Sequence, residues 1–179
     1  KQIKFDFINL NKIEKKLNQI FKKEGLPDIF INCSYAFTKD WKHSSFKEVS
    51  INSITKNIDL QLNSNIWISK IVAEKMRKNR IKGNIILLSS IYGVVAQDTT
   101  IYQNTNLKLN SIYPAVKGAL INHTKQLASH YGQFSIRVNT ISPGGIKGKI
   151  AGTKNKHSAK FVKNYSKKTA LKRMALPSD

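Results

Sequence analysis

The sequence is short of cysteine and of long apolar runs. Its single cysteine, Cys33, excludes a disulfide within the chain, leaves no cysteine cluster for a metal ion and fits a reducing, cytoplasmic compartment. No apolar run approaches the roughly 20 residues of a membrane span, and no signal peptide is visible. We therefore expect a cytoplasmic protein with no metal centre and no membrane partner.

Acidic side chains are also scarce. The 179 residues include 10 acidic and 31 basic side chains, for a formal net charge of +21. Such a charge is typical of proteins that bind nucleic acids or anionic membranes. However, only four of the basic residues are arginine, and no basic cluster is interleaved with aromatic residues. We interpret the excess of lysine as a compositional bias and expect no specific nucleic-acid partner, which salt-sensitive binding of DNA or RNA would contradict.

The middle of the chain predicts a strand, a helix and a second strand. An apolar run over 84–90 ends in two serines, and another over 135–141 breaks into a Pro-Gly turn. Between them, a helical pattern covers 112–131. This order implies a right-handed βαβ unit in a parallel sheet, with the carboxyl ends of the strands forming one functional edge.

Three side chains near that edge form a candidate proton-transfer site. Tyr113 and Lys117 are four residues apart, so they share one face of the predicted helix. A phenol has a pKa near 10, which an ammonium within roughly 4–6 Å and the positive end of a helix would lower. Ser90 would then donate a hydrogen bond to a substrate oxygen. Such a set moves a proton on or off a carbonyl or carbinol oxygen, although the bare Tyr–Lys spacing also fits a surface pair.

Apolar periodicity predicts the remaining elements. Alternation indicates a strand over 2–8, and a helical stripe indicates a helix over 10–24. A short buried strand follows over 28–33, and a long helix over 55–79. At 179 residues, a single domain with a real core is expected.

The central motifs resemble the classical short-chain dehydrogenase/reductase superfamily. Tyr113 and Lys117 match its Tyr-x-x-x-Lys signature. Ser90 matches its catalytic serine, and Asn139–Gly144 match its Asn-x-x-x-Pro-Gly turn. The resemblance covers nearly the whole chain and implies a Rossmann-like three-layer α/β sandwich with a parallel sheet. Because the family's first strands and its C-terminal part have no counterpart, we expect residues 1–179 to be one partial domain, truncated at both ends.

The resemblance also implies an NAD or NADP cofactor. In the family, an Asp after an early strand contacts adenine, the lysine binds the nicotinamide ribose, and the Pro-Gly turn faces the nicotinamide. Asp6 would equally fit a solvated carboxylate at a strand end. The cofactor-binding residues implied for this chain are Asp6, Asn32, Tyr113, Lys117, Pro143, Gly144 and Ile146.

Two positions depart from the family's pattern. Its Asn-Asn-Ala-Gly motif reads Asn32-Cys33-Ser34-Tyr35 here, and the Cβ of Tyr35 restricts a backbone that glycine leaves free. The family's catalytic Asn, which holds a water in the proton relay, corresponds to Gln61. Asn63 lies two residues away, about 200° around the helix, so it cannot replace that Asn in the same register. Either Gln61 holds the water through its longer side chain, or the relay is altered.

The resemblance implies an oxidoreductase that interconverts a secondary alcohol and a ketone by hydride transfer. Tyr113 would move the proton as acid and base, Lys117 would lower its pKa, and Ser90 would hold the oxygen. A catalytically silent binding or scaffold subunit is the alternative, favoured by the changes at Tyr35 and Gln61.

The segment 97–110 makes the link between the serine and the tyrosine longer than the family norm. Its amides and hydroxyls suit a small carbonyl or alcohol substrate of the sugar or nucleotide-sugar type, although a tolerated surface insertion fits equally well. The segment 146–160 corresponds to the family's substrate lid, and 161–174 is again helical in pattern. We also expect a homodimer or homotetramer, packed through the helices of Trp67 and Gly118 about a two-fold axis.

Overall fold

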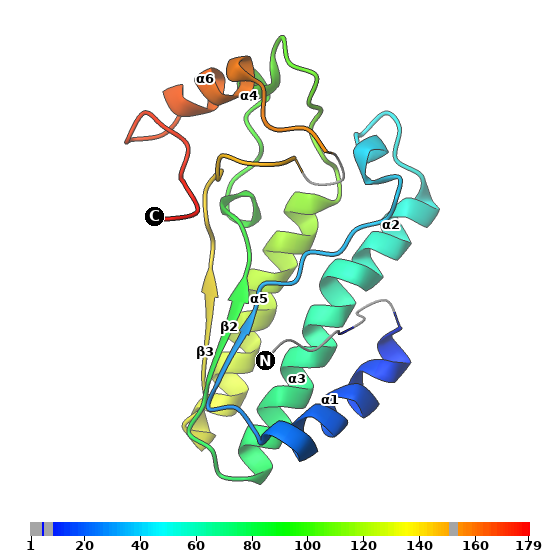
Figure 1. Ribbon diagram of the computed structural model, residues 1–179, viewed down its shortest axis with the longest axis vertical. Coiled ribbons are helices and arrows are strands. Elements are labelled where there is room, and N and C mark those ends of the chain that lie inside the picture. Colours follow the sequence, from blue (N-terminus) through cyan, green and yellow to red (C-terminus); the bar gives the residue numbers. More distant parts are fainter. Residues whose placement is uncertain (1–4, 6–8, 151–153) are drawn as a thin grey trace.

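The fold is built on a short parallel sheet. A computed structural model describes residue 5 and residues 9–150 and 154–179 of the chain. Within them, three parallel strands lie side by side in the order β1 (Ile29–Asn32), β2 (Asn84–Leu88) and β3 (Arg137–Ile141) (Figure 1). All three carboxyl ends therefore meet at one edge, as the strand–helix–strand pattern predicts.

The structure confirms the parallel sheet and shortens the predicted strands by one or two residues at their ends. The strand predicted over 2–8 lies outside the described residues except for Phe5, and Asp6 lies outside them as well. The sheet of the described residues therefore consists of the three strands that carry the candidate site.

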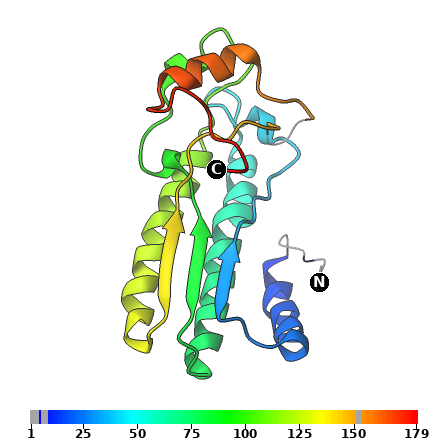
Figure 2. The same cartoon turned by 60° about the vertical axis from the view of Figure 1, so that its left-hand side comes forward.

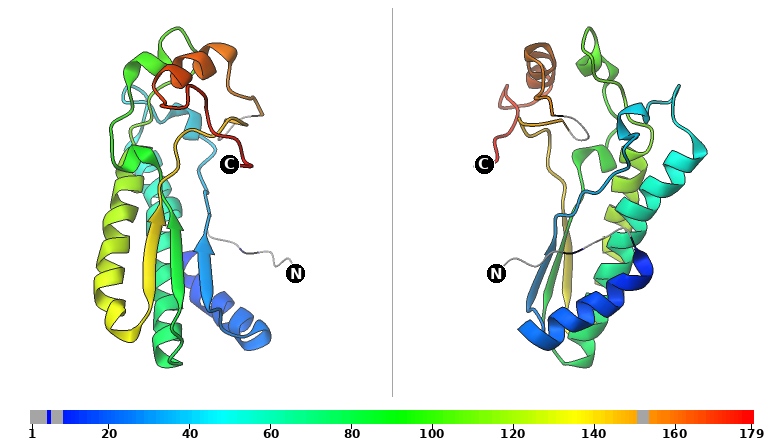
Figure 3. Two further views of the ribbon diagram at one scale, coloured as in Figure 1. Left: turned by 90° about the vertical axis from the view of Figure 1, so that its left-hand side faces the viewer. Right: turned by 45° about the vertical axis from the view of Figure 1, so that its right-hand side comes forward.

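Helices cover one face of this sheet. α1 (Leu10–Glu24), α3 (Ser64–Lys78) and α5 (Tyr113–Tyr131) all lie on the same side (Figure 2), as the right-hand view of Figure 3 also shows. On the opposite face, Ile29 and Ile31 are more than half exposed. The described residues therefore form two layers of the predicted Rossmann-like sandwich, with an incomplete sheet.

The main core lies between the sheet and these helices. Its side chains come from the helical stripes and from the inward positions of the strands. They are Ile13, Leu17, Ile68, Ile71, Val72, Ala73, Met76, Ile85, Leu87, Leu127, Tyr131, Ile136 and Val138. Burying one such leucine or isoleucine stabilises the fold by roughly 1.5–3 kcal/mol. This core fixes α3 and α5 against the strands.

The long helix predicted over 55–79 begins earlier and contains an irregular turn. α2 (Ile51–Ile58) is capped by Ser50, whose Oγ accepts a hydrogen bond of 3.2 Å from a backbone N–H of the first turn. A π-helical turn, η2 (Asp59–Asn63), then joins α2 to α3. Such turns are rare and occur frequently at functional sites, and this one contains Gln61.

The segment that follows β2 packs closely against the first turns of α5. A Cβ at Gly93, in the short helix η3 (Ile91–Gly93), would lie 2.7 Å from the carbonyl carbon and oxygen of Lys117. The Ser89 hydroxyl donates a hydrogen bond of 2.7 Å to the same carbonyl. Gly118, which the sequence predicts in a subunit contact, faces the Gly93 carbonyl at 3.3 Å from its own ideal Cβ position. Its small size therefore serves a contact within the chain.

A cap lies beyond the carboxyl ends of the strands. It consists of the segment 97–110, which contains the short helix α4 (Thr99–Tyr102), and of α6 (Ala159–Lys167) (Figure 1). The helix predicted over 161–174 therefore ends early. The chain turns after α6, and Lys172 adopts a left-handed φ of 53°, which a right-handed helix does not contain.

Candidate active site

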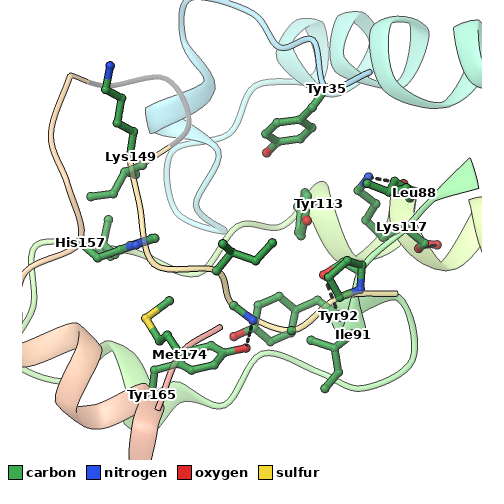
Figure 4. Close-up of a pocket in the computed structure, with 18 of the residues that line it drawn as sticks. Tyr35, Leu88, Ile91, Tyr92, Tyr113, Lys117, Lys149, His157, Tyr165 and Met174 are labelled. Atoms are coloured by element: carbon green, nitrogen blue, oxygen red, sulfur yellow. Dashed lines mark hydrogen bonds between the residues drawn. The ribbon is translucent and has the colours of Figure 1, made fainter. Parts of the chain in front are cut away.

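A cavity of about 690 Å³ opens between the carboxyl edge of the sheet and the cap (Figure 4). Its walls come from the loop after β1, the end of β2, α5, the turn after β3 and α6. The predicted site residues that line it are Ser90, Tyr113, Lys117, Pro143, Gly144 and Ile146. The fold thus brings together in one cavity residues that are more than 50 positions apart in the sequence.

Lys117 is the buried cation of this cavity. Its side chain is 6% exposed, and Nζ donates a hydrogen bond of 2.9 Å to the Leu88 carbonyl at the end of β2. The same nitrogen lies 5.6 Å from the ring centroids of both Tyr35 and Tyr113. Burial lowers the pKa of Lys117 to about 8, because the ammonium loses its hydration.

The phenol of Tyr113 differs from the expectation. Burial raises its pKa above 10, whereas a hydrogen bond with Ser90 lowers it without restoring the ordinary value. The predicted lowering by Lys117 does not appear, because the pKa of Lys117 is itself lowered to about 8, so its amine is already neutral at the pH where the phenol ionises. Ser90 is nevertheless beside the phenol, as predicted, and its Oγ also accepts a hydrogen bond of 3.2 Å from the Tyr92 N–H.

Asn110 fixes the start of the helix that carries Tyr113. Its Oδ1 accepts hydrogen bonds from the backbone N–H groups of Ile112 (2.9 Å) and Tyr113 (2.8 Å). These are N–H groups that have no partner within the helix. This role was not predicted from the sequence; the bond from the N–H two residues on makes Asn110 the start of an Asx turn.

Tyr35 forms an aromatic wall opposite Tyr113. The two rings meet edge to face, with centroids 5.8 Å apart, and Figure 4 shows the Tyr35 ring above the Tyr113 side chain. Phe37 and Trp41 extend this wall, at centroid distances of 5.5 and 6.2 Å from Tyr35. The loop after β1 therefore anchors itself through its large aromatic residues and also borders the site.

Two predicted residues lie outside the cavity lining and carry unpartnered polar atoms. Gln61 is 3% exposed within η2, and neither its amide nitrogen nor its amide oxygen has a hydrogen-bond partner. Asn32 is 5% exposed; its Oδ1 accepts a 3.0 Å bond from the Ser34 N–H, but its Nδ2 has no partner. Buried amides without partners are rare and costly, so both positions fit a bound water or ligand.

The described residues fit the nicotinamide and ribose part of a dinucleotide. Lys117 Nζ and the free Nδ2 of Asn32 are donors of the kind that ribose hydroxyls accept. The turn at Pro143-Gly144 borders the same cavity. Among the described residues, however, no glycine-rich turn leads from a strand directly into a helix, which is the usual cradle of the pyrophosphate.

The comparisons with known proteins agree with this arrangement. The profile of a family described as enoyl-(acyl carrier protein) reductase matches residues 2–179. A post-translational flagellin modification protein A of Campylobacter coli is 31% identical over 172 residues, which cover 96% of this chain and 64% of that protein. A 3-oxoacyl-[acyl-carrier-protein] reductase of Buchnera aphidicola is 32% identical over 96% of this chain and 63% of that protein. The chain belongs to the short-chain dehydrogenase/reductase superfamily.

Solved structures show the same fold. A short-chain dehydrogenase from Leptospira borgpetersenii with bound NAD+ has a TM-score of 0.83 at 30% identity, covering 98% of this chain and 63% of that chain. A 4-hydroxyisoleucine dehydrogenase complexed with NADH has a TM-score of 0.76 at 27% identity, covering 98% of this chain and 67% of that chain. The cofactor class of this family is therefore NAD(P). The chain spans just under two thirds of the length of the curated relatives it matches.

No helix in the described part of the chain is long and apolar enough to cross a membrane.

Proposed function

We propose that the full-length protein is an NAD(P)-dependent oxidoreductase that interconverts a secondary alcohol and a ketone. The observation that carries this proposal is the convergence of Ser90, Tyr113 and Lys117 in one cavity at the carboxyl edge of the sheet. A bound dinucleotide would supply or accept the hydride. Every other role falls to side chains of this chain.

Tyr113 would move the proton of the substrate oxygen. Its phenol lies beside Ser90 in the cavity, so a substrate oxygen placed between the two hydroxyls would receive a hydrogen bond from each. Lys117 would exchange its bond to the Leu88 carbonyl for a ribose hydroxyl, and its ammonium beside the ring would stabilise the phenolate. Gln61, whose amide is buried and unpartnered, would hold the water that returns the proton.

The proposed substrate is a hydroxylated small molecule of the sugar, polyol or nucleotide-sugar type. Relatives at 24–29% identity include a D-arabinitol 2-dehydrogenase, a sorbose reductase and an L-fucose dehydrogenase. The cavity offers such a substrate hydroxyl, phenol and imidazole groups, and its volume exceeds that of a single sugar ring. These groups come from Ser90, Tyr35, Tyr92, Tyr102, His157 and Tyr165.

We further propose a cytoplasmic homodimer or homotetramer, packed through α3 and α5. Trp67 on α3 is only partly buried within the chain, and Lys70 Nζ lies 4.8 Å over its ring. A two-fold contact at Trp67 would bury this pair. Light scattering of the full-length protein tests it, since a strictly monomeric mass would contradict the proposal.

The experiment that tests the activity is a turnover assay on the full-length protein with NADH and NADPH and a panel of ketoses. The nicotinamide absorbance reports the reaction, and Tyr113→Phe is the reference variant. Turnover that disappears in Tyr113→Phe supports the enzyme. A catalytically silent subunit has its own observation, the ring of Tyr35 beside Lys117; dinucleotide binding without turnover on any substrate, or equal turnover in Tyr113→Phe and wild type, would favour it.

A further inference from the structure

The turn that follows β3 is held by one side chain of the cap. The Gly145 N–H donates a hydrogen bond of 2.6 Å to the Tyr165 hydroxyl, which comes from α6 (Figure 4). The Tyr165 ring covers the same residue so closely that a Cβ at Gly145 would lie 2.6 Å from its Cζ. Tyr165 is itself 6% exposed. Its hydroxyl and its ring therefore both act on the one glycine.

Two other backbone groups of this turn also have hydrogen-bond partners. The Gly145 carbonyl accepts a hydrogen bond of 3.0 Å from the Ala175 N–H, and the Pro143 carbonyl accepts one of 3.0 Å from the Ile91 N–H. Because Ile91 directly follows Ser90, the turn is tied to the proton-transfer residues on one side and to the cap on the other. Among these contacts, the bond from Gly145 to Tyr165 is the one made by a side chain.

The segment 97–110 holds α6 in place. The Asn164 amide donates hydrogen bonds of 3.1 Å to the carbonyls of Ile101 and Gln103, and Lys168 forms a 2.9 Å ion pair with Asp98. Ile101, Phe161, Tyr165 and Met174 form a buried cluster between α4 and α6. The segment is therefore the platform on which α6 rests.

The base of this platform reaches the catalytic helix. The Gln97 amide donates a 2.9 Å hydrogen bond to the Tyr102 hydroxyl, and its oxygen accepts a 3.0 Å bond from the Asn110 N–H. Asn110 in turn caps the helix that starts at Tyr113. Contacts thus run without a break from the first turn of α5 through 97–110 and α6 to the turn at Gly145.

We propose that Tyr165 is a positioning residue for the turn that faces the nicotinamide, and that the segment 97–110 supports Tyr165 in this role. The proposal rests on the proposed function, since it assigns the turn to the dinucleotide. The Tyr165 hydroxyl sets the orientation of the peptide before Gly145, and through it the groups of Pro143 and Gly144 that border the cavity. The segment 97–110 then contributes to dinucleotide binding by holding Tyr165 in place.

Hydrogen exchange tests the positioning without any ligand. In Tyr165→Phe, the ring packing is kept and the acceptor of the Gly145 N–H is removed, so exchange at Gly145 should accelerate at least tenfold. Tyr131→Phe is the matched control, because Tyr131 is also a buried phenol, donates a 2.9 Å bond to Glu74 and lies outside the cavity. Unchanged exchange at Gly145 in Tyr165→Phe would overturn the proposal.

Dinucleotide titration of the full-length protein tests the functional part. Nicotinamide fluorescence should show a Kd for NADH or NADPH that is about 3- to 10-fold higher in Tyr165→Phe, the cost of one lost hydrogen bond, and unchanged in Tyr131→Phe. Asn164→Ala, which frees α6 from the platform, should raise the Kd in the same direction by a smaller factor. Equal Kd values in wild type and Tyr165→Phe would overturn the proposal.

Tyr165→Leu separates positioning from simple packing. If the ring alone matters, Tyr165→Phe should recover both the melting temperature and the Kd that Tyr165→Leu loses. We expect Phe to recover the melting temperature only, and recovery of both would overturn the proposal. A wild-type protein that binds neither dinucleotide would instead overturn the proposed function, while exchange at Gly145 would still decide whether Tyr165 holds the turn.

Discussion

The two sides of the cavity are constructed in different ways. On the proton-transfer side, Ser90 follows β2 and Lys117 lies in α5, and the two segments approach one another through backbone atoms at Gly93 and through one short bond from Ser89. On the cap side, α6 and 97–110 are joined by side chains, through amide bonds, one ion pair and an aromatic cluster. A close contact between backbone atoms restricts which residues the position can accept. A contact between side chains can be altered by substituting a single residue. We expect the chemistry to depend on the first side and substrate choice on the second.

The largest effect is expected for residues 1–179 alone, because their described part contains both sides of the cavity but no glycine-rich strand-to-helix turn for the phosphates. Residues 1–179 expressed alone should bind neither NADH nor NADPH, although Ser90, Tyr113 and Lys117 are all in place. The exposed Ile29 and Ile31 should also make this polypeptide poorly soluble. Titration with nicotinamide fluorescence as the readout checks this, and saturable binding in the micromolar range would show that the cradle is not required.

The next effect breaks the proton-transfer side alone. In the full-length protein, Tyr113→Phe should lower turnover by about 10²- to 10⁴-fold, because the proton has no carrier. Fold and dinucleotide affinity should stay close to wild type, since the ring still fills its place. Steady-state kinetics and a dinucleotide titration check both parts. A similar loss of turnover in Tyr131→Phe would mean that the effect is not specific to the site.

Lys117→Met should weaken both turnover and dinucleotide binding, because the ammonium acts on the phenol and on the ribose. It also has a pH signature. The pKa of Lys117 is lowered to about 8 in the folded protein, against about 10.4 for an unfolded lysine. Between these values the unfolded chain binds more protons, so stability should rise as the pH increases from about 8 to 10. Urea unfolding at several pH values should show this rise in wild type and lose it in Lys117→Met.

Dinucleotide affinity should change in the opposite direction over the same pH range. The ammonium is the form that donates to the ribose, so binding should weaken as the pH rises through about 8. Lys117→Met should bind weakly at every pH in this range. An affinity that rises with pH in wild type would contradict a role for the ammonium.

The effect of Gly93→Ala on stability tests the close backbone contact on the proton-transfer side. The added Cβ meets backbone atoms of Lys117 at 2.7 Å, so the structure must move, at a cost of about 1–3 kcal/mol in the free energy of unfolding. Gly132→Ala is the matched control, because a Cβ there meets nothing within 4 Å. Chemical denaturation of both variants checks the difference. Equal stability would mean that the backbone contact between Gly93 and Lys117 leaves room for a Cβ.

The smallest effect compares one helix cap from each side. Asn110 accepts bonds from the N–H groups at the start of α5, and Ser158 caps α6, where its Oγ accepts a 3.2 Å bond from the Phe161 N–H. Replacing either by alanine should cost about 1 kcal/mol of stability. However, Asn110→Ala should mainly lower kcat, because it loosens Tyr113, and Ser158→Ala should mainly raise KM. If both variants changed kcat and KM in the same proportion, the two sides of the cavity would not have the separate roles proposed here.

The parallel sheet, the helix at Tyr113 and the meeting of Ser90, Tyr113 and Lys117 were predictable from the sequence, because apolar periodicity and motif spacing are local properties. The structure also brings Pro143, Gly144 and Ile146 to the same cavity. The roles of Asp6, Asn32 and Gln61 stay predictions. Asp6 lies outside the described residues, and the other two are marked only by unpartnered amides.

What the sequence could not provide depends on contacts between distant segments. Nothing near Asn164 indicates that its amide will bind carbonyls more than 60 residues away, and nothing near Tyr165 points to Gly145. The raised pKa of Tyr113 was missed because it follows from burial, which depends on the Tyr35 wall and the cap together. The end of α6 was misplaced because its apolar spacing continues after the backbone has turned.

Because of the π-helical turn at Asp59–Asn63, the effect of a one-residue deletion in this long helix depends on where the deletion falls. A π turn holds more residues than an α turn over the same stretch of axis. A deletion of one residue within this turn would convert it into an ordinary α turn and leave α2 in nearly the same rotation about the axis relative to α3. Ile54 and Ile58 would then stay against the cluster around Trp41, whereas a deletion of one residue in the regular turns of α3 would rotate them by about 100° relative to the rest of that helix. We therefore expect a deletion in the regular turns to destabilise the protein more than a deletion in the π turn, because only the former turns apolar side chains away from their partners.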